Sequence, residues 1–419
     1  MKGNLSSRAK AISLSATLEI DELGKKLRAA GKPVISFGAG EPDFPTPEAA
    51  LEAAKAGVDS PKMHKYSPVG GLLKLREKVA KQINAEQALP DNATFSAEDI
   101  IVTNGGKQAV FESLAVLIDP DDEVLLPKPS WLTYAEVVKY LGGKSIAVET
   151  DREYKITPET LSSAYTDKTS LLVLNSPANP TGAVYTEDEL IAIGKWCLER
   201  DIWCVADEIY EYLIYPPLLN ERVEKGFQTA PHLLEVCPEL RERTIIINGV
   251  AKSSAMTGWR VGWAAGPRDA INAMKRMQGH LTSNVNNIAQ VAAISALESI
   301  NENVSAMRSV FDERRLLISS LLNEIDLATN GYFRLASPQG AFYAFVDISG
   351  LIGKEIGKSR NVAMDANDFA KMLLEEVNVA VVPMDSFGIE NHIRFSYALA
   401  SDDIREGIRR IHDFLTTSN

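Results

Sequence analysis

Residues 248–262, NGVAKSSAMTGWRVG, carry the pattern that decides the fold of this chain. The runs RTIIIN (243–248) and VGWAAGP (261–267) flank them, and each predicts a short buried strand. Lys252 is therefore expected in a loop of small residues between two strands, where its amine has room for a ligand. Arg260 follows eight residues later and can return to the same pocket. A lysine that loses solvent near other cations has a lowered pKa and becomes a nucleophile toward carbonyl groups.

A second signal lies 45 residues upstream of Lys252, where the apolar run IWCVAD (202–207) ends on Asp207. A buried carboxylate without a partner is costly, so Asp207 needs a cation beside it. Tyr210, three residues on, can point the same way. The alternatives are a helix cap for Asp207 and a solvated loop lysine for Lys252. The two signals together favour a binding site.

Composition excludes several classes of protein. The 419 residues are enough for one large domain and a smaller second one. The net charge of −12 argues against nucleic acid or an anionic membrane as the main partner. No apolar run reaches the roughly 18 residues that span a bilayer, and the N-terminus lacks a signal-peptide core. Three cysteines, Cys197, Cys204 and Cys237, are too few and too scattered for a disulfide framework or a metal site. Cys197 and Cys204 fall in apolar runs, which predict buried thiols, and a reducing cytoplasm is expected.

From about residue 99 to 270 the pattern alternates strands with helices, which predicts a mainly parallel sheet with helices on both faces. Gly105 and Gly106 form a turn before a helix that begins near Lys107. A helix N-terminus after such a turn favours anions, although this signal is weak by itself.

Residues 5–30 predict one amphipathic helix.

After about residue 325 the pattern changes to that of a small α+β domain. FRLASPQGAFYAFVDI (333–348) and VAVVPMDSF (379–387) predict strands, and residues 366–378 predict a helix. A last strand contains Arg394, and an amphipathic helix over 401–415 closes the chain. A surface position is the default expectation for such an arginine, but its guanidinium could equally bind a carboxylate in bidentate fashion.

These motifs, in this order from about Ser36 to Ala400, resemble the class I and II aminotransferases of fold type I, which bind pyridoxal 5'-phosphate (PLP). The resemblance is strongest to their prokaryotic aspartate aminotransferase subgroup. It implies an α/β fold whose large domain, 46–325, has a mainly parallel seven-stranded sheet between helices. Residues 1–45 together with 326–419 would form a small α+β domain.

The resemblance also implies roles for individual residues. Lys252 would hold PLP as a Schiff base and move the substrate's Cα proton, Asp207 would keep the ring nitrogen protonated, and Tyr210 would bond the ring oxygen. Tyr66 would reach the cofactor phosphate of the other subunit, so a homodimer with shared active sites is expected. The cofactor-binding set is Lys252, Gly105, Gly106, Lys107, Trp131, Asn179, Asp207, Tyr210, Arg260, Tyr66 and Ser253.

The expected substrates are an acidic amino acid, aspartate or glutamate, and a 2-oxo acid, 2-oxoglutarate or oxaloacetate, with prephenate or aromatic compounds as additional substrates. Two positions depart from common family patterns. Ala251 replaces a serine that binds phosphate in many relatives, and Gly279 replaces an arginine that binds the distal carboxylate in the enterobacterial type. In the resembled subgroup Lys107 and Thr17 take over that distal role. The substrate-binding set is Gly40, Trp131, Asn179, Arg394, Lys107 and Thr17.

Three alternatives stay open at this point. A PLP-dependent C–S β-lyase or an aminocyclopropane-carboxylate synthase-like enzyme shares the same key residues. A PLP-sensing regulator that carries a DNA-binding head does not fit, because no helix-turn-helix pattern precedes the fold and the chain is acidic. An inactive PLP-binding module is disfavoured because Lys252, Asp207 and Arg394 are all present.

Overall fold

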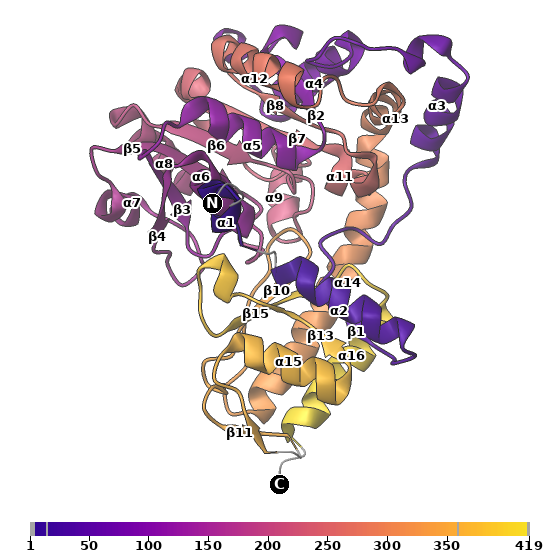
Figure 1. Cartoon of the computed structure of the whole chain (residues 1–419), viewed down its shortest axis with the longest axis vertical. Helices are drawn as coiled ribbons and strands as arrows, with labels where there is room; N and C mark the ends of the chain where they lie inside the picture. The colour runs from indigo at the N-terminus through magenta and orange to yellow at the C-terminus, as the bar shows by residue number, and fades with distance from the viewer. Residues whose placement is uncertain (1–4, 14–15, 358–359, 417–419) are drawn as a thin grey trace.

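A seven-stranded sheet forms the centre of the larger part of the molecule (Figure 1). The computed structural model describes the chain apart from residues 1–4, 14–15, 358–359 and 417–419. The strand order is β2-β8-β7-β6-β5-β3-β4, and only β8 runs antiparallel to its neighbours. The predicted mainly parallel sheet is confirmed. Its strands are β2 (Ile100–Thr103), β3 (Glu123–Pro127), β4 (Lys144–Val148), β5 (Thr169–Asn175), β6 (Trp203–Asp207), β7 (Thr244–Gly249) and β8 (Gly262–Ala265).

Helices cover both faces of this sheet because successive residues of each strand point to opposite sides. In β3, Val124 and Leu126 face one hydrophobic core while Leu125 faces another. The first core contains α5 (Gly106–Leu117), α6 (Leu132–Leu141) and α12 (Arg268–Leu281). The second contains residues of α3 (Glu48–Val58), α4 (Leu73–Glu86), α7 (Pro158–Ala164), α8 (Glu187–Glu199), α10 (Leu233–Val236) and α13 (Asn287–Glu298).

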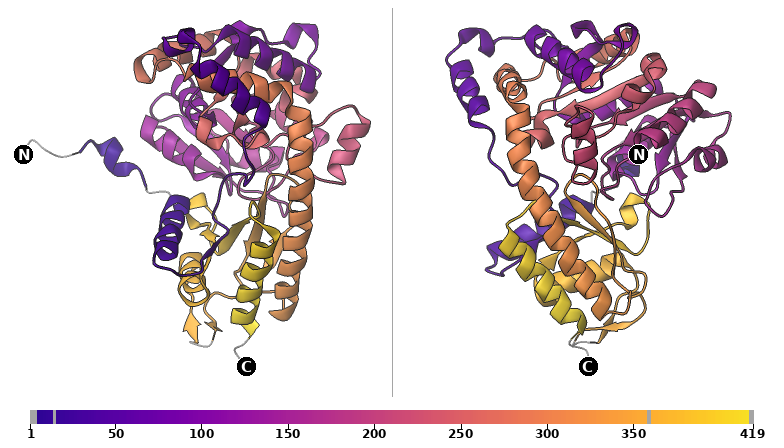
Figure 2. Two further views of the ribbon diagram at one scale, coloured as in Figure 1. Left: turned by 90° about the vertical axis from the view of Figure 1, so that its right-hand side faces the viewer. Right: turned by 180° about the vertical axis from the view of Figure 1, so that it is seen from behind.

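The C-terminal part has its own core around a four-stranded antiparallel sheet in the order β14-β15-β10-β9. The long helix α14 (Ile300–Ala328) joins the two parts: Val304 packs in a core of the large sheet, and Phe311 packs in the C-terminal core (Figure 2). The N-terminal strand β1 (Ile35–Ser36) pairs with β13 (Val379–Ala380) in this same part.

The remaining elements complete the chain. The other strands are β9 (Arg334–Ala336), β10 (Tyr343–Asp347), β11 (Glu355–Ile356), β12 (Asn361–Val362), β14 (Val382–Pro383) and β15 (His392–Ser396). The other helices are α1 (Ser7–Ala11), α2 (Ala16–Ala29), α9 (Leu218–Glu224), α11 (Val250–Ser253), α15 (Ala366–Val377) and α16 (Ser401–Thr416).

Several local predictions were wrong. The single helix over residues 5–30 is two helices, because Ile12 is extended and the Ser13 N–H donates to the carboxylate of Glu136 in α6 at 2.9 Å. The expected strand 379–387 is two short strands, β13 and β14, followed by the 3₁₀ helix η6 (Asp385–Phe387), and the stretch 333–348 forms two separate strands, β9 and β10.

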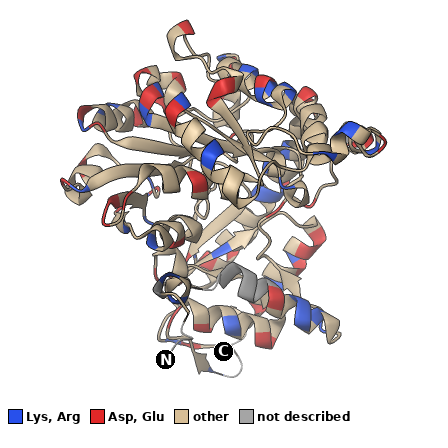
Figure 3. Cartoon of the chain, turned by 45° about the horizontal axis from the view of Figure 1, so that its top comes forward, with Lys and Arg blue, Asp and Glu red and all other residues tan. Residues whose placement is uncertain are grey.

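The surface and the cysteines agree with the sequence analysis. All three cysteines are buried free thiols. Basic and acidic residues alternate along the helices (Figure 3). Within the described part of the chain, no helix is both long enough and apolar enough to cross a membrane.

Candidate active site

The carboxyl ends of the parallel strands bring the predicted residues to one edge of the large sheet. Asp207 ends β6, and β7 ends at Gly249, directly before the helix that carries Lys252. At the end of β2 comes the turn that contains Gly105. In open parallel sheets ligands bind outside this edge, so the fold places the candidate residues where a ligand site is expected.

Lys252 lies on the one-turn helix α11, where the sequence had predicted a loop. Its partly buried amine donates a hydrogen bond to the carbonyl of Gly40 and lies 5.9 Å from the centre of the Tyr210 ring. Loss of solvent lowers the pKa of Lys252 to about 8, and Arg394 and Arg260 act in the same direction. A substantial fraction of the amine is therefore neutral near pH 8, which is the nucleophilic form.

Asp207 is only 4% exposed. Its Oδ2 accepts a hydrogen bond of 2.6 Å from the hydroxyl of Tyr134, and its Oδ1 accepts one from the Ile209 N–H. Burial raises the pKa of Asp207 to about 6, although these two hydrogen bonds by themselves lower it. Among the described residues no lysine, arginine or histidine forms a salt bridge with this carboxylate. Tyr134 is a site residue that sequence reasoning missed.

Arg394 reaches the site from β15 in the C-terminal part, and it is 2% exposed. Its Nη1 donates to the Oδ1 of Asn179 at 2.8 Å, and its guanidinium lies 4.4 Å from the centre of the Tyr343 ring. The Tyr343 hydroxyl is 2.8 Å from that of Tyr210. The Nε of Arg394 is buried and has no partner among the described residues.

Asn179 is fixed by a second asparagine that the sequence analysis did not single out. The Asn179 N–H donates to Asn175 Oδ1 at 2.9 Å, and Asn175 Nδ2 donates to the Asp207 carbonyl at 2.8 Å. These bonds connect the loop after β5 to the end of β6. The positions of Asn179 and Asp207 are therefore coupled.

An anion site can form where α5 begins. Gly105 is the N-cap residue of α5 and has φ +80°, and the first helical N–H groups have no partner within the helix. Arg260 donates to the Asn104 carbonyl at 3.2 Å and to the Thr257 carbonyl at 2.9 Å. A Cβ added to Gly105 would lie 2.6 Å from Arg260 Nη2, so only glycine leaves the guanidinium in this place.

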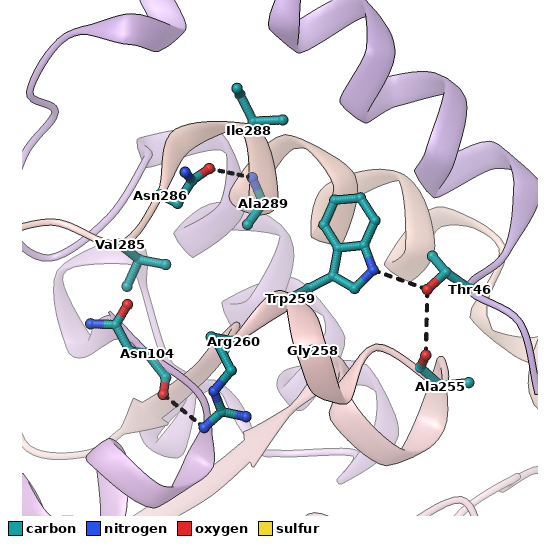
Figure 4. A pocket seen from close by; sticks show the side chains of 10 residues that line it. All are labelled: Thr46, Asn104, Ala255, Gly258, Trp259, Arg260, Val285, Asn286, Ile288 and Ala289. Atoms are coloured by element: carbon teal, nitrogen blue, oxygen red, sulfur yellow. Dashed lines mark hydrogen bonds between the residues drawn. The ribbon is translucent and has the colours of Figure 1, made fainter. Parts of the chain in front are cut away.

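A cavity of about 630 Å³ opens beside this arginine (Figure 4). The indole N–H of Trp259 bonds Thr46 on its other side, at 3.0 Å. Ten residues line the cavity: Thr46, Asn104, Ala255, Gly258, Trp259, Arg260, Val285, Asn286, Ile288 and Ala289.

The other predicted residues are less closely connected to Lys252. The Lys107 ammonium lies 4.9 Å from the centre of the Trp131 ring, which precedes α6. The Ser253 hydroxyl bonds the Gly249 carbonyl at 3.4 Å, whereas the buried hydroxyl of Ser254 has no partner among the described residues. Ser254 is thus a second candidate that the sequence analysis missed.

Two predicted residues are not joined to the site in this single chain. Tyr66 follows the 3₁₀ helix η1 (Pro61–His64), is 90% exposed and makes no hydrogen bond or ring contact to the site residues above. The side chain of Thr17 lies outside the part of the chain that the structure describes.

Comparison with known proteins identifies the family of this chain. The family model described as "Aminotransferase class I and II" matches residues 32–411. The chain belongs to this aminotransferase family. A relative named aspartate aminotransferase from Streptomyces avermitilis is 44% identical over 98% of this chain and 96% of its own. One named aspartate/prephenate aminotransferase from Cereibacter sphaeroides is 38% identical over 98% of both chains.

Solved structures of the aminotransferase family agree with this assignment. The structure of the Thermus thermophilus aspartate aminotransferase with maleate superimposes with a TM-score of 0.88 at 35% identity, covering 99% of this chain and all of that one. The aspartate aminotransferase from Rhizobium meliloti gives 0.89 at 33% identity, with the same coverage. The fold class inferred from the sequence is confirmed.

Replacing Gly105 with alanine tests the anion site of this aminotransferase-family protein. The alanine is strained at positive φ and displaces the Arg260 guanidinium, so we expect a loss of about 1–3 kcal/mol of folding free energy and weaker binding of inorganic phosphate. Urea unfolding and phosphate titration measure both. Gly258→Ala, two residues before Arg260, is the control, because its added Cβ meets nothing within 4 Å. Equal effects of the two substitutions would contradict an anion site at Gly105 and Arg260.

The amine of Lys252 can be titrated directly by competitive labelling of the apoprotein with an amine reagent. Half-maximal reactivity is expected near pH 8, well below the value of about 10.4 for an unperturbed lysine. Because the Glu41 carboxylate raises the pKa of Lys252, Glu41→Gln is expected to move the midpoint to lower pH. A midpoint near 10, or an upward shift in the variant, would show that this description of the site is wrong.

Proposed function

We propose that the protein is a PLP-dependent aminotransferase that exchanges the amino group of aspartate or glutamate with a 2-oxo acid, 2-oxoglutarate or oxaloacetate. The observation that carries the proposal is that a nucleophilic lysine lies at the same sheet edge as a buried carboxylate that forms no salt bridge with any described residue. The relatives named above support the reaction and its acidic substrate. They favour it over a C–S β-lyase.

The residues present fit PLP. Lys252 would hold the cofactor covalently, and Asp207, which lacks a cation, would receive a protonated ring nitrogen. The turn at Gly105 and Gly106 and the guanidinium of Arg260 match a phosphate group. The unpartnered hydroxyl of Ser254 offers a further hydrogen bond. When bound, PLP supplies an electron sink for the substrate's Cα.

The chain's own contribution to the reaction is proton transfer and positioning. The Lys252 amine would take the proton from the substrate Cα and give it up again at a different carbon, and a pKa of about 8 suits an amine that must do both near neutral pH. Asp207 fixes a positive charge at the opposite end of the site. Tyr210 and Asn179 would bond the cofactor's ring oxygen.

Substrate binding follows from the side chains around this centre. The guanidinium of Arg394, held by Asn179 and the Tyr343 ring, would bind the α-carboxylate in bidentate fashion. Gly40 and Trp131 would line the same position. Lys107 would bind the distal carboxylate of aspartate or glutamate, and Thr17 is proposed beside it on the basis of the family resemblance.

The assembly is also part of the proposal. An exposed fraction of 90% for the large side chain of Tyr66 supports a homodimer in which this tyrosine completes the phosphate site of the partner subunit. We propose a large domain, 46–325, and a small domain of 1–45 with 326–419. The separate hydrophobic cores support a division into two domains, and the part of α14 from Met307 to Ile325 packs in the C-terminal core.

A single-turnover reaction tests the function. We expect the holoenzyme, mixed with aspartate and no 2-oxo acid, to release about one oxaloacetate per subunit and no ammonia, because the amino group stays on the enzyme until an acceptor is added. Lys252→Ala should release none. In a parallel assay with a thioether amino acid, the release of pyruvate, ammonia and a thiol would indicate a C–S β-lyase, and no reaction with aspartate would refute the substrate. Adding prephenate after aspartate shows whether it accepts the amino group.

A further inference from the structure

The turn after β6 has two faces. Asp207 and Tyr210, three residues apart, face the candidate active site. Glu208 and Glu211 have the same spacing and face a buried cluster on the other side, where they are 5% and 6% exposed. Nothing in the proposed reaction uses these two carboxylates. Their environment therefore needs its own explanation.

His232 lies between the two carboxylates. Its Nδ1 is 3.1 Å from Glu208 Oε2, and its Nε2 is 3.8 Å from Glu211 Oε2. The Nε2 also lies 3.0 Å from the hydroxyl of Thr229. Hydrogen-bonding groups thus face both ring nitrogens, and an imidazolium can donate on both sides.

Among the described residues His232 is the only cation paired with Glu208 or Glu211, and Lys78 of α4 acts on the neighbouring Glu86. Gln87, the residue after α4, donates from Nε2 to Glu208 Oε2 at 3.0 Å, and its Oε1 is buried without a partner among the described residues. Glu86, also on α4, adds a carboxyl whose pKa is raised by burial and by Glu211. Asn248 of β7 hydrogen-bonds Glu211.

The buried Arg222 is already paired with Glu235 at 2.7 Å and Glu187 at 2.8 Å. No lysine or arginine of the described residues forms an ion pair with Glu208 or Glu211. Buried carboxylates that lose their only cation are strongly destabilising.

The protonation of His232 follows from this geometry. Burial by itself lowers the pKa of His232, but the carboxylates of Glu208 and Glu211 raise it above 6.5 overall. Burial raises the pKa of Glu211 as well, and the positive charge of His232 opposes this rise. The cluster therefore keeps protons near neutral pH that the same groups would lose in water.

Backbone bonds connect the cluster to the active-site side of the turn. The Glu208 N–H donates to the Ile247 carbonyl and the Glu211 N–H to the Glu208 carbonyl, both at 2.9 Å. The Ala230 N–H donates to the Glu211 carbonyl at 2.8 Å. A displacement of Glu208 or Glu211 would therefore move the backbone that carries Asp207 and Tyr210.

We propose that His232 is a positioning residue: as an imidazolium held between Glu208 and Glu211, it fixes the turn that presents Asp207 and Tyr210 to the active site. The effect on cofactor binding rests on the function proposed above. The protonation state of His232 does not depend on that function. The two statements can therefore fail separately.

Nuclear magnetic resonance of the histidine side chains tests the first statement on the full-length apoprotein. His232→Gln identifies the His232 signal, and the exposed His280 serves as a reference. We expect both ring nitrogens of His232 to carry a proton at pH 7. A neutral ring at pH 7 overturns the proposal. So does stoichiometric binding of Zn²⁺ or Mn²⁺ that His232→Gln abolishes, because a metal-bound imidazole is neutral.

Charge removal tests the link to the active site. His232→Gln leaves the carboxylates without a cation, and we expect PLP to bind about tenfold more weakly. In the triple variant E208Q/E211Q/H232Q the cluster is neutral, so affinity should return to within about threefold of the parent. A triple variant no better than the single one, or a single variant that binds like the parent, overturns the positioning role. If the parent itself binds no PLP, the proposed function fails, and the state of His232 decides this inference.

Discussion

The site depends on one buried carboxylate. Asp207 ends the central strand β6 with its side chain removed from water, and among the described residues only a tyrosine hydroxyl and a backbone N–H donate hydrogen bonds to its carboxylate. A protein keeps such a group when a ligand supplies the missing positive charge, since burial alone would favour its protonation. The other features of the site are arranged around this requirement.

The fold meets the requirement by bringing distant segments to one edge. The ends of β2, β6 and β7 deliver Gly105, Asp207 and Lys252 from positions that are far apart in the sequence. The C-terminal part contributes Arg394 and Tyr343, and the segment after β1 contributes the carbonyl that holds the lysine. Residues from both parts of the molecule thus form the site. Since α14 runs from one hydrophobic core to the other, its course affects how these residues lie relative to one another.

The sequence predicted what depends on local patterns. Alternating strands and helices gave the sheet and the position of α5, and a carboxylate at the end of an apolar run indicated Asp207. Contacts between distant residues left no such pattern: Tyr134 reaches Asp207 across 73 positions, and Tyr343 reaches Tyr210 across 133. The break between α1 and α2 has the same cause, because Ser13 bonds a residue 123 positions away.

The most direct test of the account is the site of covalent attachment. The PLP-loaded protein is reduced with borohydride, digested, and analysed by peptide mass spectrometry. The account predicts that the cofactor is found on Lys252 and that Lys252→Ala carries none there. Attachment to another lysine such as Lys107, or no attachment after loading with PLP, would contradict it.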